Sequence, residues 1–323
     1  MQASDQDRLN WRGVIWFLAI AYALAWLIDL PMYLDGKGLS SPWAALIVLQ
    51  NFTPAVATFL VVRWLRPLPA IRRFTGLRRA EPGTPWARYW LIGLLAPIVF
   101  AVAAPFVAAL FGLYRLDLVD FSGYRETLTS LSFAPQLLAL GSIQMVVAIG
   151  FLFTVVYALV TTPFTFGEEW GWRGYLLPSL LPLGQWPALL LTGAIWGFWH
   201  APLILLGFNY PLHHVVGVFL MVVLGMILGT ILGWLRLASG SVWPAVLGHA
   251  AIDASAGAIF VFGQAGASYD AAQVGITGWT GWILPLVFIA FLVLTHRLPV
   301  GGPATISQQP SPNDQILESR RAG

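Results

Sequence analysis

Two adjacent glutamates followed by an arginine form the first group of residues whose types and spacing suit catalysis. Their segment, Phe166–Tyr175, is predicted to be helical because no stop signal follows the preceding apolar run until Pro178. On a helix, Glu169 and Arg173 are i,i+4 neighbours and are predicted to pair, whereas Glu168 points about 100° away. Glu168 is then a carboxylate without a cation in an apolar setting, which suits a general base.

Two histidines later in the chain supply imidazoles. Trp196 lies one helical turn before His200 and is predicted to stack on its ring, and His249 and Asp253 share a helix face. We expect Glu168 and His200 to deprotonate a water for attack on a carbonyl. We expect His249 and Asp253 to donate hydrogen bonds to the oxyanion that then develops. Such a set would form a metal-free amide hydrolase.

Other catalytic chemistries find little support in the sequence. Cysteine is absent, which excludes disulfides, thiolate nucleophiles and Cys-based metal sites. The motifs H-E-x-x-H, G-x-S-x-G and Gly-x-Gly-Asp are also absent. Zinc held by His200, His249 and a glutamate remains an alternative, although typical ligand spacing is missing and Asp253 is better placed as a partner of His249. The sequence therefore predicts no cofactor.

The elements that must position these residues are membrane helices. Of the 323 residues, 58% are hydrophobic and only 10% are charged, which is outside the range of soluble domains. A bilayer core of about 30 Å needs about 20 apolar residues per helical crossing. We therefore predict an all-α, multi-pass protein of the cell membrane with about eight transmembrane helices. The predicted spans lie near 13–34, 42–65, 89–113, 136–166, 186–207, 213–235, 240–263 and 276–296.

The distribution of positive charge orients the predicted bundle. The longest polar connection, 66–88, is rich in arginine, whereas the connections on the other side hold only Lys37, Arg115 and Arg125. The positive-inside rule then places both termini in the cytoplasm. The arginine-rich loop either sets this topology or binds anionic lipid headgroups. The formal net charge of +3 does not suggest a nucleic-acid partner.

The spans leave no room for a separate soluble domain. We predict an N-terminal cytoplasmic segment, three helices that include the arginine-rich loop, a catalytic core, a last transmembrane helix and a disordered tail rich in Pro, Gly, Ser and Gln. The predicted boundaries, in that order, are 1–12, 13–135, 136–263, 264–298 and 299–323.

Several other residues have simpler explanations than catalysis. Aromatic and ionisable side chains gather at the membrane interface, where we place Asp29, His213, His214 and most tryptophans, Trp170 and Trp172 included.

Small residues and ion pairs also have structural explanations. Gly225, Gly229 and Gly233 repeat every four residues, which favours close helix packing inside the bundle over a dimer interface. Taken alone, the cluster of Glu168, Glu169 and Arg173 would equally suit a structural ion pair at a helix end.

Three motifs, in order, resemble those of the CPBP family of intramembrane proteases, described as glutamic or metal-dependent. The family includes the type II CAAX prenyl proteases and Abi-like membrane proteins. Its motifs are E-E-x-x-x-R, aromatic-x-x-x-H and H-x-x-x-N or D. They look like Glu168 to Arg173, Trp196 to His200 and His249 to Asp253 in this sequence. The resemblance covers roughly residues 163–256.

The resemblance implies an eight-helix glutamic endopeptidase in which Glu168 and His200 activate water. It also implies that His249 and residue 253 form the oxyanion site, and that Glu169 with Arg173 is structural. The best-understood members have Asn where this chain has Asp253. Because an ionised Asp cannot donate a hydrogen bond, Asp253 must be protonated or must only orient His249.

The leading functional prediction is an endopeptidase that cleaves a membrane-associated or prenylated-type substrate from the cytoplasmic side. Its expected partners are a peptide or lipidated protein and membrane lipids. One alternative is a non-catalytic immunity or scaffold protein of the same fold. A small-solute transporter is a third alternative, which continuous spans without paired broken helices disfavour.

Overall fold

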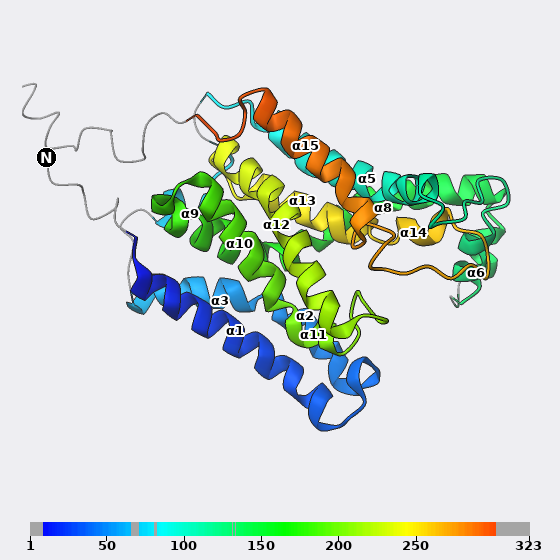
Figure 1. Ribbon diagram of the computed structural model, residues 1–323, viewed down its shortest axis with the longest axis horizontal. Helices are drawn as coiled ribbons and strands as arrows, with labels where there is room; N and C mark the ends of the chain where they lie inside the picture. The colour runs from blue at the N-terminus through cyan, green and yellow to red at the C-terminus, as the bar shows by residue number, and fades with distance from the viewer. Residues whose placement is uncertain (1–8, 66–70, 81–82, 131, 133, 302–323) are drawn as a thin grey trace, which may run out of the picture.

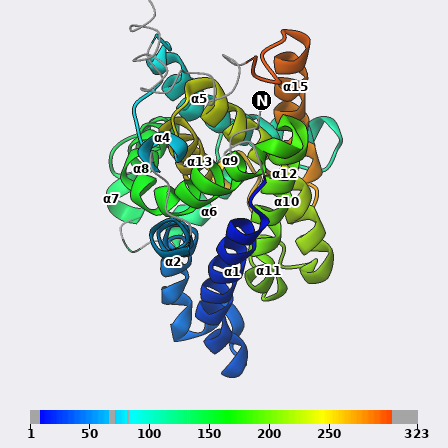
Figure 2. The same ribbon diagram turned by 90° about the vertical axis from the view of Figure 1, so that its left-hand side faces the viewer.

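The computed structural model describes residues 9–65, 71–80, 83–130, 132 and 134–301. Within these ranges the chain is a bundle of helices, and the only β pairing is an isolated antiparallel bridge between Leu116 and Gly263. Helices α1 and α3 lie along one side of the bundle and α5 and α15 along the opposite side, with α10, α12 and α13 between them (Figures 1 and 2). The all-helical architecture is as predicted.

Within the described residues, five helical segments are long and apolar enough to cross a membrane: Trp11–Leu34 (α1), Trp86–Leu110 (α5), Ile143–Leu183 (from α8, Ile143–Glu169, to η6), His214–Ser239 (α12) and Trp243–Val261 (α13, Trp243–Ser255, with α14, Ala258–Val261). A sixth crossing forms if Pro42–Gln50 and Thr53–Arg63 are one span bent by 44°. The two remaining predicted spans contain shorter helices: Gln185–Trp199 (α10) with Ala201–Leu205 (α11), and Trp279–Trp282 (η7) with Ile283–Leu294 (α15). The chain is therefore a multi-pass membrane protein, and eight crossings with cytoplasmic termini stay a prediction.

Short helical segments complete the described chain: η2 (Gly38–Ser40), η3 (Pro42–Leu46), α2 (Ile47–Gln50), α3 (Thr53–Leu60), η4 (Val61–Leu65), α4 (Ile71–Phe74), α6 (Ser122–Thr129), α7 (Ala134–Leu138), η5 (Trp170–Leu176), α9 (Leu177–Leu180) and η6 (Leu181–Leu183). The fourth predicted span starts at 143 rather than 136. Ser142 caps α8 there, because its Oγ accepts a hydrogen bond from the Met145 amide over 3.3 Å.

Two apolar segments that were predicted to be continuous are broken. The second breaks between Gln50 and Thr53, and the fifth breaks at His200. Pro54 and Pro202 lie just after these breaks, and their missing N–H groups leave carbonyls four residues earlier without a helical donor. The prediction of unbroken spans was wrong at both places.

Helix α1 donates three hydrogen bonds to the backbone around the break at His200. The Tyr22 hydroxyl donates to the Ile195 carbonyl over 2.5 Å, and the Tyr33 hydroxyl donates to the Pro202 carbonyl over 2.5 Å. The Trp26 indole N–H donates to the Trp199 carbonyl over 3.3 Å. These three side-chain donors tie α1 to the backbone on both sides of His200.

Glycines bring α10 and α12 into backbone contact. A Cβ added to Gly225 would lie 2.5 Å from the Gly193 carbonyl oxygen, and one added to Gly197 would lie 2.5 Å from the Met221 carbonyl oxygen. The glycine repeat therefore packs inside the bundle, as predicted. Gly229 continues this contact, because its added Cβ would lie 3.0 Å from Gly193 Cα and 3.1 Å from Arg173 Nη2.

Gly229→Ala is expected to lower stability by about 1–3 kcal/mol, because the methyl group must displace the buried Arg173 guanidinium or the α10 backbone. Thermal unfolding of the purified protein measures this change. Gly257→Ala is the matched control, since a Cβ there meets no atom within 4 Å. Equal melting temperatures for the two variants would contradict the prediction.

Some residues predicted to lie at the membrane interface are buried. Asp29 has 0% of its surface exposed. Trp172 is also buried, edge-on to Phe17 and to Trp199. Interfacial composition does not distinguish such residues from core residues, because both environments accept amphipathic rings. His213 keeps a helix-end position, and its Nε2 lies 2.8 Å from Asp270 Oδ2.

Two predicted polar segments are partly ordered. Val300, in the predicted disordered tail, donates its amide to Gln185 Oε1 and accepts from Gln185 Nε2, each over 2.8 Å. Residues 302–323 lie outside the described ranges. The arginine-rich loop contains α4, and Arg236 Nη2 donates to the Phe74 carbonyl over 2.8 Å. Residues 66–70 and 81–82 of that loop also lie outside the described ranges.

Candidate active site

The predicted site residues come from three packed helical regions. Helix α8 continues into the π-helix η5 and keeps the two glutamates and Arg173 on one segment. Helix α13, which carries His249, packs against α8 and α12, and α10 packs against η5 and α12. The side chains of Glu168, Glu169, Arg173 and His249 are all buried.

Glu169 lies between an arginine and a histidine. Arg173 Nη1 donates to Glu169 Oε1 over 2.7 Å, which confirms the predicted i,i+4 pair. His249 Nδ1 lies 3.0 Å from the same oxygen. Because a carboxylate can only accept, His249 carries a hydrogen on Nδ1. This contact was missed, since Glu169 and His249 are 80 positions apart and no local pattern joins them.

The second ring nitrogen of His249, Nε2, lies on the side of Asp253. His249 Nε2 and Asp253 Oδ2 are 3.8 Å apart, which is an ion-pair distance but longer than a hydrogen bond. The Asp253 side chain is 52% exposed, in contrast to the buried Glu169. The predicted His249–Asp253 partnership is therefore present as a looser, one-turn contact on α13.

Glu168 has an indole partner in place of a cation. Trp196 Nε1 donates to Glu168 Oε2 over 2.8 Å. The same indole lies edge-on to His200 and His249, with ring centroids 5.8 Å and 5.0 Å away. Arg173 Cζ lies 4.5 Å from its ring centroid. The predicted stacking of Trp196 on His200 was wrong, because the hydrogen bond to Glu168 turns the indole to an interplanar angle of 67° with the imidazole.

His200 has a defined tautomer. Its Nδ1 lies 2.9 Å from the Trp196 carbonyl oxygen, which can only accept, so Nδ1 carries the hydrogen. The lone pair of the neutral ring is then on Nε2. Trp199 lies edge-on to the ring at 4.9 Å between centroids. His200 thus presents one nitrogen that can accept a proton.

Residues 148–255 match the family model for type II CAAX prenyl endopeptidases, Rce1-like. The matched segment is about a third of the chain and contains every predicted site residue. The resemblance drawn from the three motifs is confirmed over this segment. A search of curated proteins finds no match. The match supports a CAAX-type intramembrane protease in general.

The contacts of the two histidines bear on the zinc alternative. Among the described residues, no group of three His, Cys, Asp or Glu side chains could hold a metal ion. His249 Nδ1 is occupied by Glu169, and His200 Nδ1 by a main-chain carbonyl. Both contacts leave Nε2 free, so the choice between the metal-free site and the zinc alternative based on His200, His249 and a glutamate stays a prediction.

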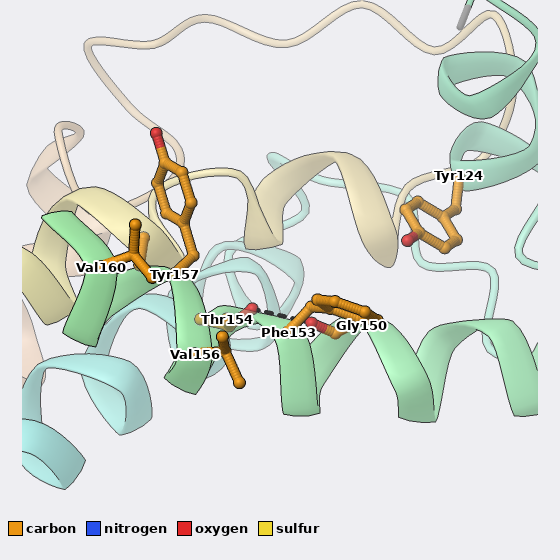
Figure 3. Close-up of a pocket in the computed structure, with 8 residues that line it drawn as sticks. Tyr124, Gly150, Phe153, Thr154, Val156, Tyr157 and Val160 are labelled. Carbon is orange, nitrogen blue, oxygen red and sulfur yellow. Dashed lines mark hydrogen bonds between the residues drawn. The ribbon is translucent and has the colours of Figure 1, made fainter. Parts of the chain in front are cut away.

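A hollow of about 410 Å³ lies beside the candidate site, between α6, α8 and the end of α13. Figure 3 shows Tyr124 of α6 across from Gly150, Thr154 and Tyr157 of α8. Ala254, the residue after Asp253, also lines it. No local sequence pattern predicts this hollow, because three segments far apart in the chain line it.

Proposed function

We propose that this protein is an intramembrane endopeptidase that uses Glu168 and His200 to activate water against a peptide carbonyl. The observation that supports it best is the buried Glu168, which accepts a hydrogen bond from an indole that also contacts both imidazoles. A purely structural ion pair would need Glu169 and Arg173 only. It would not account for Glu168 in the same core.

The reaction begins with a water beside Glu168. Trp196 occupies one carboxylate oxygen, and the other accepts a proton as the water oxygen attacks the carbonyl carbon. His200 Nε2 accepts a hydrogen bond from the same water and orients it. The proton held by Glu168 then passes to the amide nitrogen as the C–N bond breaks, which releases an amine and a carboxylic acid.

His249 stabilises the oxyanion in this scheme. Glu169 holds Nδ1 and leaves Nε2 facing away from the ion pair, so a protonated ring directs Nε2–H at the developing charge. Asp253 lies 3.8 Å from Nε2 on the same helix and is half exposed. We assign Asp253 to orienting His249 rather than to donating a hydrogen bond itself.

The hollow beside Asp253 supports a substrate that reaches the site from the lipid phase. Phe153, Val156, Tyr157 and Val160 line it with largely exposed side chains on the outward face of α8. An apolar segment lying there would place the adjoining peptide bond near residue 253.

Cleavage by the purified protein tests this function directly. The protein is reconstituted in liposomes with a farnesylated CAAX peptide or the same peptide without the lipid, and mass spectrometry identifies the products. We expect one internal peptide bond of the lipidated peptide to be cleaved, with unchanged rate after chelator treatment. Cleavage of neither peptide would favour the scaffold alternative. A loss on chelation that zinc restores would overturn the metal-free mechanism.

Trp196→Phe is expected to lower kcat/KM by about 10- to 100-fold, because phenylalanine keeps an aromatic ring but lacks the indole N–H that donates to the Glu168 carboxylate. The liposome cleavage assay measures kcat/KM for the variant and the wild-type protein. Trp234→Phe is the matched control, since it removes another buried indole bond, from Nε1 to the Arg297 carbonyl over 3.1 Å. Equal losses in the two variants would show that Trp196 acts through stability alone.

A further inference from the structure

We propose that the break in the second apolar segment binds a monovalent cation, with Asp29 Oδ1, Thr53 Oγ1 and the Gln50 main-chain carbonyl as ligands. This inference does not depend on the proposed protease function. It rests on three features of α1, α2 and α3, of which α1 packs against both others.

The first feature is a buried carboxyl group in α1. Asp29 is 0% exposed and receives a hydrogen bond from Gln50 Nε2 to Oδ2 over 3.1 Å. Its other oxygen, Oδ1, is buried without a hydrogen-bond partner. An ionisable group at this depth in a membrane helix needs a counter-charge or a proton.

The second feature is the break that directly follows Gln50, whose side chain binds Asp29. Gln50 ends α2 and Thr53 begins α3, and both side chains are buried. Pro54 has no N–H to donate to the Gln50 carbonyl four residues earlier. Thr53 Oγ1 is also buried without a partner. Unwound carbonyls and neutral oxygens at broken helices are typical ligands of alkali cations in membrane proteins.

The third feature is the direction of the Asp29–Gln50 hydrogen bond, which distinguishes a cation from a proton. Oδ2 accepts from an amide N–H, so a proton on the carboxyl group would have to reside on Oδ1. There it would become a buried donor without an acceptor. A cation at Oδ1 instead neutralises the charge and fills the vacant lone pairs. One carboxylate with neutral oxygens suits a monovalent ion better than a divalent one.

The break also lies against the helix of the candidate active site. A Cβ added to Gly167, the residue before Glu168, would lie 2.5 Å from the Asn51 carbonyl oxygen and 2.9 Å from the Phe52 ring. A cation that stiffens the segment between Gln50 and Thr53 would therefore stiffen the backing of α8 next to Glu168.

Thermal unfolding of the full-length protein in a neutral detergent tests the proposal. The protein is compared in NaCl, KCl or LiCl against choline chloride at equal ionic strength. We expect at least one alkali cation to raise Tm by about 3 °C or more, saturably, because ligands of the folded state stabilise it. Asp29→Asn should abolish the rise, and Thr53→Val should weaken it.

Asp35→Asn provides the matched control, since it removes a carboxylate that accepts from Ser41 Oγ and the Lys37 amide outside the break. It should retain the full cation effect. A wild-type Tm independent of all three cations would overturn the proposal. So would an equal cation effect in Asp29→Asn, or a Tm that responds to pH but to no cation. All of these readouts are independent of peptide cleavage.

Discussion

Replacing Glu168 with glutamine is expected to lower the rate of peptide cleavage by about 10²- to 10⁴-fold and to leave the bundle folded. Glutamine keeps the shape of the side chain, and its carbonyl oxygen still accepts from Trp196 Nε1. The variant loses only the capacity to take a proton from water. Single-turnover cleavage in liposomes, with Tm measured beside it, separates the loss of the base from a loss of structure.

Glu126→Gln is the control for this experiment. Glu126 is exposed on α6, where its Oε2 accepts from the Gly266 amide over 3.0 Å. Its replacement should leave the cleavage rate within about twofold of the wild-type rate. Wild-type turnover in Glu168→Gln would remove the general base from the mechanism and return the cluster to a structural role.

Replacing Arg173 with methionine is expected to destabilise the protein by about 3–5 kcal/mol. Both side chains of the Arg173–Glu169 pair have 0% exposure, so the variant leaves a carboxylate buried with only His249 as its partner. The methionine fills much of the same volume, which isolates the charge from the packing. Unfolding titrations in mixed micelles measure the free energy of unfolding of the wild-type protein and the variant.

A double variant, Arg173→Met with Glu169→Gln, should recover part of that loss because no unpaired carboxylate remains. It should nevertheless cleave poorly, since a neutral amide holds the Nδ1 of His249 less firmly. If the loss of stability in the double variant equalled the sum of the losses in Arg173→Met and Glu169→Gln, the pair would contribute no coupling energy, contrary to its geometry.

Local spacing predicted the parts of the site that lie on a single helix. Glu169 and Arg173 pair because i and i+4 side chains meet on any helix, and His249 and Asp253 share a face for the same reason. The helical class and the membrane setting followed from composition, because long apolar runs have few other stable conformations in lipid.

Contacts between helices were beyond such reasoning. The hydrogen bond from Trp196 to Glu168 joins residues 28 positions apart, and its direction depends on how α10 crosses the bundle. Trp196 was recognised as support for His200, but its role as a donor to Glu168 was not. The hydroxyl and indole donors of α1 were likewise indistinguishable from an aromatic belt.

The helix breaks had a sequence signal that hydropathy outweighed. Pro54 and Pro202 were visible in the sequence, yet proline is tolerated inside membrane helices and so did not dictate a break. Asp29 was placed at an interface for a related reason. Its partner Gln50 comes from another segment, and depth along α1 alone does not show burial by a neighbouring helix.

Three side chains of α1 donate hydrogen bonds to the carbonyls of Ile195, Trp199 and Pro202. These bonds affect how a fragment of the chain without α1 would behave. The family match begins only at residue 148, but excising the matched portion would strip the backbone beside His200 of its phenolic and indole donors. The carbonyls would keep only their main-chain partners, such as the Leu206 amide that donates to the Pro202 carbonyl over 3.3 Å. A fragment that lacks α1 is therefore expected to hold the backbone beside His200 less firmly than the full chain does.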